Sequence, residues 1–289
     1  MNKISQYIFS TVLGLVVFFF WIILHPYDLS FQEQNQLFLF TWDYFLERIS
    51  VCGGLADYIA EFITQFNYIP YLGEALMALL FVIFQIVTAA SICRKEWYVL
   101  SFITPVMMLV YMNDIYVMLC YLIALIIAAS MCALYRRYPG VLWACIATVL
   151  GYWLIGPAIF VFTLFAVLRE RSWNFLILVA VAVLTLVVSK WTYLQQYPWK
   201  TLAFGVNYYR HALVVPPMQL VIAAAAVLVP AFSDLLPKPK TYVNFALGLL
   251  IAATGALGCW LDYEKDVVEI IAYDQLVRQE DWDGLLERA

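Results

Sequence analysis

Long apolar runs alternate with short polar connections along most of the chain. A straight membrane-spanning helix needs about 20 residues, each rising 1.5 Å. The pattern therefore predicts an all-α, polytopic helical membrane protein with about nine transmembrane segments, in a membrane domain that covers residues 1–261. The nine apolar runs are about 7–24, 71–92, 97–111, 116–134, 141–155, 157–168, 173–188, 214–235 and 242–261.

Three of these runs, 97–111, 141–155 and 157–168, are short for a full crossing. Two interpretations stay open: tilted helices sheltered by their neighbours, or a re-entrant hairpin that turns at Gly156-Pro157. The first run is followed by Leu-His-Pro-Tyr, with no small-x-small cleavage site. We therefore expect a retained first span and not a cleaved signal peptide.

Composition supports the membrane assignment. Hydrophobic residues make up 65% of the chain and charged residues 12%, whereas about a quarter of the residues of a soluble domain are charged. The expected partner is thus the lipid bilayer, and nothing in the net charge of −4 suggests nucleic acid. The six cysteines are Cys52, Cys93, Cys120, Cys132, Cys145 and Cys259, and only Cys52 is clearly in a polar segment. Most lie in apolar runs, where cysteine acts as a small hydrophobe, so no disulfide framework is expected.

The basic residues indicate an orientation, because short cytoplasmic loops are enriched in Lys and Arg. If the N-terminus is cytoplasmic, the short outer turns Asn113-Asp114 and Ile155-Gly156 carry no basic residue. We therefore expect a cytoplasmic N-terminus and an extracytoplasmic C-terminus. Nine of the 16 basic residues then fall in inner connections: Lys3, Arg94, Lys95, Arg136, Arg137, Arg169, Arg171, Lys238 and Lys240.

Residues 29–66 are both charged and apolar, and they lie between the first two spans. Ser30 and Glu33 fit a capping box, which predicts a helix over 31–49. Gly53-Gly54 ends it, and a second helix follows over 55–66. We expect an amphipathic helical hairpin in the outer interface plane, with its aromatic faces toward the lipid.

One frame, Asp-Tyr-apolar-x-Glu, occurs twice in this hairpin and sets two like-charged pairs at i,i+4 spacing. If the carboxylates converge, they can bracket a general base or bind a divalent cation. The alternative is a solvated polar face, with Glu33 closing the helix cap. The candidate catalytic residues are Glu33, Asp43, Glu47, Asp57 and Glu61.

A second outer segment, 190–213, carries Lys200, Arg210 and His211 among tyrosines and tryptophans. These three residues are candidates for binding a phosphate or an anionic lipid headgroup, and interfacial anchoring is the alternative. Near the exit of the first span, Asp28 is either catalytic or, more commonly for such a residue, solvated. His25 is interpreted as a helix-boundary residue.

Residues 262–289 form an acidic tail with an imperfect helical stripe at Val267, Ile270, Ile271 and Leu276. Another apolar pattern begins at Trp282. An amphipathic helix that ends in mid-pattern has nothing to bury it. We therefore expect either that the chain continues, as the start of a helical-repeat region, or that the tail packs on another protein.

The runs LSFQEQNQLFLFT at 29–41, GGLADY at 53–58 and FITQF at 62–66 resemble an uncharacterised multi-span membrane protein family of Bacteroides-group bacteria. The resemblance covers essentially the whole chain. It implies a bacterial inner-membrane protein with a membrane domain followed by helical repeats on the outer side. The family supplies no activity. Cys52 stands where the family pattern has proline, a departure at the turn before the two glycines.

The architecture also resembles the C-type polyprenyl-phosphate-dependent glycosyltransferases, which have many spans and amphipathic helices in the first outer loop. That resemblance implies an acidic catalytic residue in the loop. The loop lacks an Asp-x-Asp motif, and Asp281-Trp282-Asp283 lies in the tail.

Three functions remain open. The first is a membrane anchor or assembly component that presents outer-face helices to envelope proteins. The second is a glycosyl or related group transferase acting on a lipid-linked substrate at the outer face, with a divalent cation as its possible cofactor. The third is a transporter, although no ionisable residue lies at mid-membrane, where ion pathways usually carry one. Whether the protein is an enzyme stays open.

Overall fold

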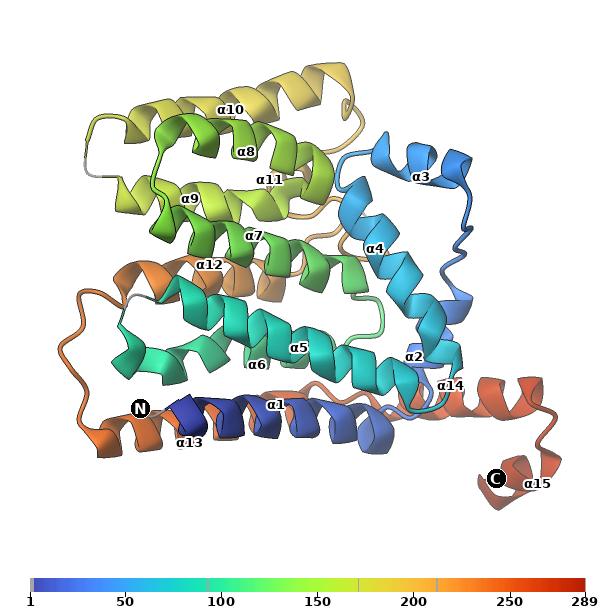
Figure 1. Cartoon of the computed structure of the whole chain (residues 1–289). Helices are drawn as coiled ribbons and strands as arrows, with labels where there is room; N and C mark the ends of the chain where they lie inside the picture. The colour runs from blue at the N-terminus through green and yellow to red at the C-terminus, as the bar shows by residue number, and fades with distance from the viewer. Residues whose placement is uncertain (1–2, 93, 171, 212, 289) are drawn as a thin grey trace.

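The structure, a computed structural model, describes residues 3–92, 94–170, 172–211 and 213–288 (Figure 1). Cys93, Arg171 and Ala289, to which predictions above refer, lie outside these ranges. Within them the regular structure is helical, apart from an isolated bridge between Val117 and Tyr209. The all-α prediction is confirmed for this part of the chain.

Six helical stretches in the described ranges are long and apolar enough to cross a membrane. In α10 and α13 only 11% and 6% of the most apolar window is buried inside the protein, so lipid is the natural cover for these helices. The chain is thus a multi-pass membrane protein by helix hydropathy, while the count of nine stays a prediction. The six stretches are α1 (Lys3–Leu24), α5 (Leu72–Ser91), α7 (Leu119–Arg137), Val141–Arg169, α10 (Phe175–Thr192) and α13 (Thr241–Leu261).

The stretch Val141–Arg169 reverses direction at Gly156, which has a φ of 70°. It contains α8 (Val141–Ile155), η3 (Gly156–Ala158) and α9 (Ile159–Arg169). The hydroxyls of Thr148 and Thr163 lie 2.8 Å apart across the two arms, so the arms pack side by side. At 1.5 Å per residue, α8 is only about 22 Å long and α9 about 17 Å.

Shorter helices complete the bundle. η2 (Lys95–Phe102) leads into α6 (Ile103–Tyr111), and the two laid end to end reach roughly 30 Å, because a 3₁₀ turn rises about 2.0 Å per residue. α12 (Pro217–Phe232) is an apolar helix below the length of the six, and α11 (Trp199–Phe204) is a single short turn on the way to it.

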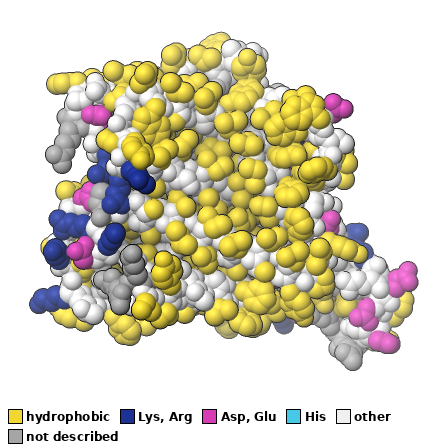
Figure 2. Space-filling model, viewed as in Figure 1, with side chains coloured by type: hydrophobic (Ala, Val, Ile, Leu, Met, Phe, Trp, Pro, Cys, Tyr) yellow, Lys and Arg dark blue, Asp and Glu magenta, His cyan; other side chains and the backbone are white. Residues whose placement is uncertain are grey.

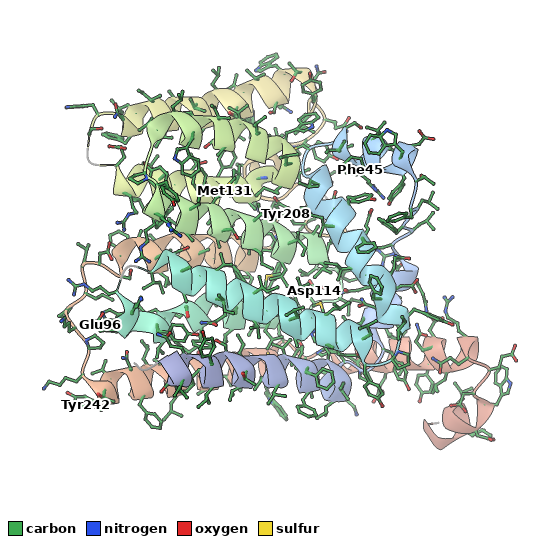
Figure 3. The ribbon with its side chains drawn as sticks, viewed as in Figure 1. Phe45, Glu96, Asp114, Met131, Tyr208 and Tyr242 are labelled. Carbon is green, nitrogen blue, oxygen red and sulfur yellow. The ribbon has the colours of Figure 1, made fainter. Side chains whose placement is uncertain are left out.

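The basic connections gather at one end of the bundle. Arg94 donates to the carbonyl of Leu236, and Arg169 pairs with Asp234 at 2.7 Å. Figure 2 shows most of the visible Lys and Arg side chains along one edge of a largely apolar face, with acidic side chains at both edges and on the tail. In Figure 3, Glu96 and Tyr242 lie at the basic end. The alternation of loops predicted from the sequence is consistent with these contacts.

The outer segment folds differently from the prediction of one helix over 31–49, which is wrong. α2 (Asp28–Gln34) begins two residues before Ser30 and has no side-chain cap, so Ser30 and Glu33 form no capping box. The chain then runs without helix to Thr41, whose hydroxyl accepts from the Tyr44 amide at 3.3 Å and starts α3 (Trp42–Ile49). Thr41, one residue before the first residue of α3, is therefore the N-cap of that helix.

The glycine turn is confirmed. Gly53, with a φ of 85°, precedes α4 (Gly54–Thr64), and the short η1 (Gln65–Tyr68) continues from it toward α5. α3 packs on α4, and α4 packs on α7 and α8 at one end of the bundle. Figure 1 shows this hairpin beside the ends of α7 and α8, away from the basic connections.

The tail leaves the bundle as α14 (Lys265–Arg278) and α15 (Trp282–Arg288). α14 lies against α2 and buries Ile271 and Leu276, whereas Ile270 is 67% exposed, so only part of the predicted stripe is covered. Figure 1 shows α14 and α15 projecting beyond the ends of the spans.

Candidate functional site

The candidate site lies where the α3–α4 turn docks onto the α8–α9 turn. The Gly53 amide donates to the carbonyl of Trp153 at 2.8 Å, and the Cys52 thiol donates to the carbonyl of Tyr152 at 3.0 Å. Trp153 returns a hydrogen bond from its indole to the carbonyl of Ile49 at 2.9 Å. A proline at position 52 could also precede this turn, but it could not supply the thiol donor. The hairpin is thus fixed by backbone contacts at its turn.

Glu61 is held by two side chains of α3. Arg48 Nη2 lies 2.7 Å from Oε1 of Glu61, and the hydroxyl of Tyr44 lies 2.6 Å from Oε2. Arg48 Nε also donates to the Tyr44 oxygen at 2.9 Å. Both carboxylate oxygens therefore have partners within the protein, and the three side chains form a clamp, the Arg48–Tyr44–Glu61 clamp, that ties α3 to α4.

Burial shapes the electrostatics of the clamp. It raises the pKa of Glu61, against the lowering effect of its hydrogen bond from Tyr44 and of the Arg48 charge. Burial, together with the hydrogen bond to Glu61, raises the pKa of Tyr44 to about 12. Tyr44 therefore remains a neutral donor, and Arg48 supplies the positive charge that balances Glu61.

Asp57 lies one turn before Glu61 in a different environment. Asn207, which has a φ of 57°, donates from Nδ2 to Oδ2 of Asp57 at 2.9 Å and to the carbonyl of Cys52 at 3.2 Å. Cys120, from the first turn of α7, donates to the Asn207 carbonyl at 2.7 Å. Asp57 thus sits between the hairpin, α7 and the segment that follows α11, without a cation of its own.

Burial raises the pKa of Asp57 to about 7, and the nearby Glu61 charge adds to the rise. Interactions with Cys120, Arg48 and Asn207 act in the opposite direction but do not cancel it. A carboxyl group that exchanges its proton near neutral pH is chemically suited to general acid–base work. Of the five predicted acids, Asp57 is the one whose surroundings fit that role.

The other three predicted acids do not join this pair. Asp43 and Glu47 are exposed on α3, and Glu33 is half-buried on α2. Across the described ranges, no three His, Cys, Asp or Glu side chains come close enough together to hold a metal ion. The structure therefore brings together Asp57 and Glu61, with separate partners, and leaves Asp43 and Glu47 facing outward.

The predicted phosphate-binding residues are split between two places. Arg210 donates to the side-chain oxygen of Asn35 at 3.1 Å and lies over the ring of Tyr116, and the His211 ring lies 5.2 Å from that same ring. Lys200 is exposed on α11, a separate element of the chain. Arg210 and His211 thus share a tyrosine at the protein surface.

Sequence reasoning missed Arg48, Tyr44 and Asn207. A signal existed for Arg48, because it is the only basic residue between positions 29 and 66 and the segment holds several acids. Asn207 carried no such signal, since its role depends on a left-handed backbone conformation 150 residues away from Asp57 along the chain. Tyr208 next to it is fully buried and accepts from the Ala158 amide at 2.9 Å, which holds this segment against the α8–α9 turn (Figure 3).

Comparison with known proteins gives a family and no activity. The model of a family of unknown function, DUF6057, matches residues 1–289. No curated protein and no solved structure matches the chain significantly.

Proposed function

Because the chain belongs to the DUF6057 family, whose description gives no activity, we propose a function from the geometry of the outer end. The protein is a membrane anchor or assembly component that presents outer-face helices to partners in the cell envelope. The observation that carries this proposal is the Arg48–Tyr44–Glu61 clamp: the most buried acid of the hairpin is used to fix its shape.

Large apolar side chains are exposed on and just before the hairpin. Leu37 and Phe40 lie in the non-helical segment between α2 and α3, and Trp42 is the first residue of α3. They are 72%, 85% and 69% exposed, respectively. Large apolar side chains that project from a fixed support are typical of interaction surfaces. The tail adds Trp282 and Leu286, both exposed on α15.

The orientation belongs to the same proposal. We place the protein in a bacterial inner membrane with the N-terminus in the cytoplasm and the hairpin and tail outside. The gathering of Arg94, Arg136 and Arg169 at one end supports this orientation, because positively charged loops stay on the cytoplasmic side.

Site-specific photo-crosslinking in the native host tests the anchor proposal. A photoreactive amino acid at position 40 should give a discrete protein adduct. The matched control is position 250 on α13, where Leu250 is 59% exposed on a span that faces lipid. If position 40 gives only the lipid adducts that position 250 gives, the outer segment does not contact a protein partner and the anchor proposal fails.

A transferase acting on a lipid-linked substrate is the second candidate, and the surroundings of Asp57 favour it. In this function Asp57 would take up the proton of an acceptor group, and Arg210 and His211 would contact a phosphate. Asp57→Asn should then change the glycan composition of the envelope, while the exposed Asp43→Asn should not. Wild-type glycans in both variants would eliminate the transferase.

A further inference from the structure

Three buried polar side chains meet at the outer end of the first span, away from the hairpin site. His25, Asp28 and Asn113 are 2%, 1% and 5% exposed. His25 Nδ1 lies 2.5 Å from Oδ2 of Asp28, and Nε2 lies 2.7 Å from Oδ1 of Asn113. The interpretation of Asp28 as a solvated residue is therefore wrong, and His25 does more than mark a helix boundary.

The hydrogen-bond partners determine which atoms carry protons. Asn113 donates from Nδ2 to the carbonyl of Cys259 at 3.4 Å, which directs its oxygen toward His25. With Asp28 ionised, each ring nitrogen of His25 then faces an oxygen that accepts and does not donate. A neutral imidazole has one N–H and satisfies one of these contacts, whereas the imidazolium satisfies both.

We propose that His25, Asp28 and Asn113 form a buried proton-binding site, in which doubly protonated His25 holds the start of the tail on the membrane domain. Through Asn113 the site reaches the last turn of α13 at Cys259. The ring of Tyr263, the second residue of the tail, packs edge-on against the His25 ring with centroids 5.6 Å apart. His25 thus joins α1 and α2 to the point where the tail leaves the bundle.

A pocket of about 310 Å³ lies between the end of α1 and α14, lined by Leu24, Pro26, Tyr263, Lys265 and Tyr273 among others. α14 also lies against α2, whose first residue is Asp28. α14 therefore packs beside the segment that holds His25 and Asp28.

The buried carboxylate of Asp28 has a counter-charge only while His25 is doubly protonated. Its second oxygen, Oδ1, is buried and has no hydrogen-bond partner within the described residues. From α1, His25 meets the uncharged rings of Phe20 and Trp21. Loss of the His25 proton would leave a buried carboxylate without a counter-charge, which is unfavourable.

The remaining charged groups near the site have other partners or point away. Asp114, next to Asn113, accepts from the Tyr116 amide and the Tyr209 hydroxyl. On the tail, Lys265 pairs with Glu269 at 3.3 Å, and Asp262 is exposed. On α2, Glu33 is half-buried beyond Asp28, and Glu264 next to Tyr263 is exposed. Among the described residues, Asp28 is the charged group that contacts His25.

Nitrogen-15 NMR of the full-length protein in lipid nanodiscs, labelled at histidine, tests the protonation state. The chain has two histidines, so the His211→Gln variant isolates the His25 signals. At pH 7.4 both ring nitrogens of His25 should carry a proton, as judged by one-bond N–H coupling. An unprotonated nitrogen at His25 would overturn the proposal.

Limited proteolysis of the tail tests the coupling. His25→Gln should increase the rate of cleavage after residue 262 by about tenfold, because the docked tail opens more often. His211→Gln, at an exposed histidine outside the site, is the matched control and should leave the rate as in wild type. Equal cleavage rates in His25→Gln and wild type would overturn the proposal, and Asp28→Asn, which also removes the ion pair, provides the same comparison if His25→Gln does not fold.

Discussion

The two acid pairs of the outer hairpin share one sequence frame and reach opposite environments. Asp43 and Glu47 on α3 are exposed. Asp57 and Glu61 on α4 are held by Asn207 and by the Arg48–Tyr44–Glu61 clamp. The partners of Glu61 both come from α3, the helix that carries the exposed pair. The repeated acidic frame therefore does not form a symmetric binding site. The first copy supplies Arg48 and Tyr44, and these two side chains hold Glu61 of the second copy.

The difference follows from packing. α4 lies against α7 and α8, so its polar side chains need partners within the protein, while α3 packs mainly on α4. A buried carboxylate without a partner costs several kcal/mol, whereas an exposed one is hydrated at no cost. Position in the bundle therefore decides which acids become structural.

The turn between the helices should show the largest effect. A Cβ at Gly54 would lie 1.7 Å from the carbonyl oxygen of Arg48, which is backbone and cannot move aside cheaply. Gly54→Ala should therefore separate α3 from α4 and lower the free energy of unfolding by about 3 kcal/mol or more. SDS titration of the protein in detergent micelles measures this quantity.

Gly53→Ala is its matched control. The added Cβ would meet nothing closer than 3.8 Å, and the cost is the φ of 85°, about 1–2 kcal/mol. Equal losses in the two variants would mean that the helices do not approach as closely as described.

Removal of the clamped acid comes next. Glu61→Ala removes the counter-charge of Arg48 and one acceptor of the Tyr44 hydroxyl, which still reaches the carbonyl of Leu37 at 2.8 Å. It should lower the free energy of unfolding by about 2 kcal/mol, a value reduced because Arg48 is partly exposed and screened. Glu47→Ala, in the same frame on α3, should change it by less than about 0.5 kcal/mol. Equal losses in the free energy of unfolding for Glu61→Ala and Glu47→Ala would contradict the difference between the two acid pairs.

Asp57 should make stability depend on pH. Its pKa is about 7 in the folded protein against an ordinary value of 3.8, so the unfolded chain releases this proton first as pH rises. Stability should therefore fall between about pH 4 and pH 7 and level off above pH 7. Thermal unfolding across this range should show a smaller decrease for Asp57→Asn than for wild type and for Asp43→Asn. If the stability of Asp57→Asn falls with pH as much as that of wild type, Asp57 is not the group that causes the pH dependence.

The exposed pair should show the smallest effect. Asp43→Asn removes a like-charge i,i+4 repulsion with Glu47 and should stabilise the protein by a few tenths of a kcal/mol. Added salt should reduce this gain, since it screens exposed charges. A loss of 1 kcal/mol or more would show that Asp43 has a structural partner.

The sequence contains enough information for the helical membrane architecture, because apolar runs and basic connections are local signals. It also predicts the glycine turn at Gly53. It misplaces the start of the hairpin, because Ser30 and Thr41 are both acceptable caps and only packing selects Thr41. The site itself depends on contacts between distant segments, such as Asn207 with Asp57, and these leave no mark in the local pattern.

A double-mutant cycle between Arg48 and Glu61 tests the central claim most directly. The free energies of unfolding of Arg48→Ala, Glu61→Ala and the double variant should reveal a coupling of about 1 kcal/mol or more, since the two side chains lie 2.7 Å apart on different helices. The same cycle between Arg48 and Glu47 should give a coupling near zero. Additive losses for Arg48 and Glu61 would contradict the account, because the second acid pair would then be no more structural than the first.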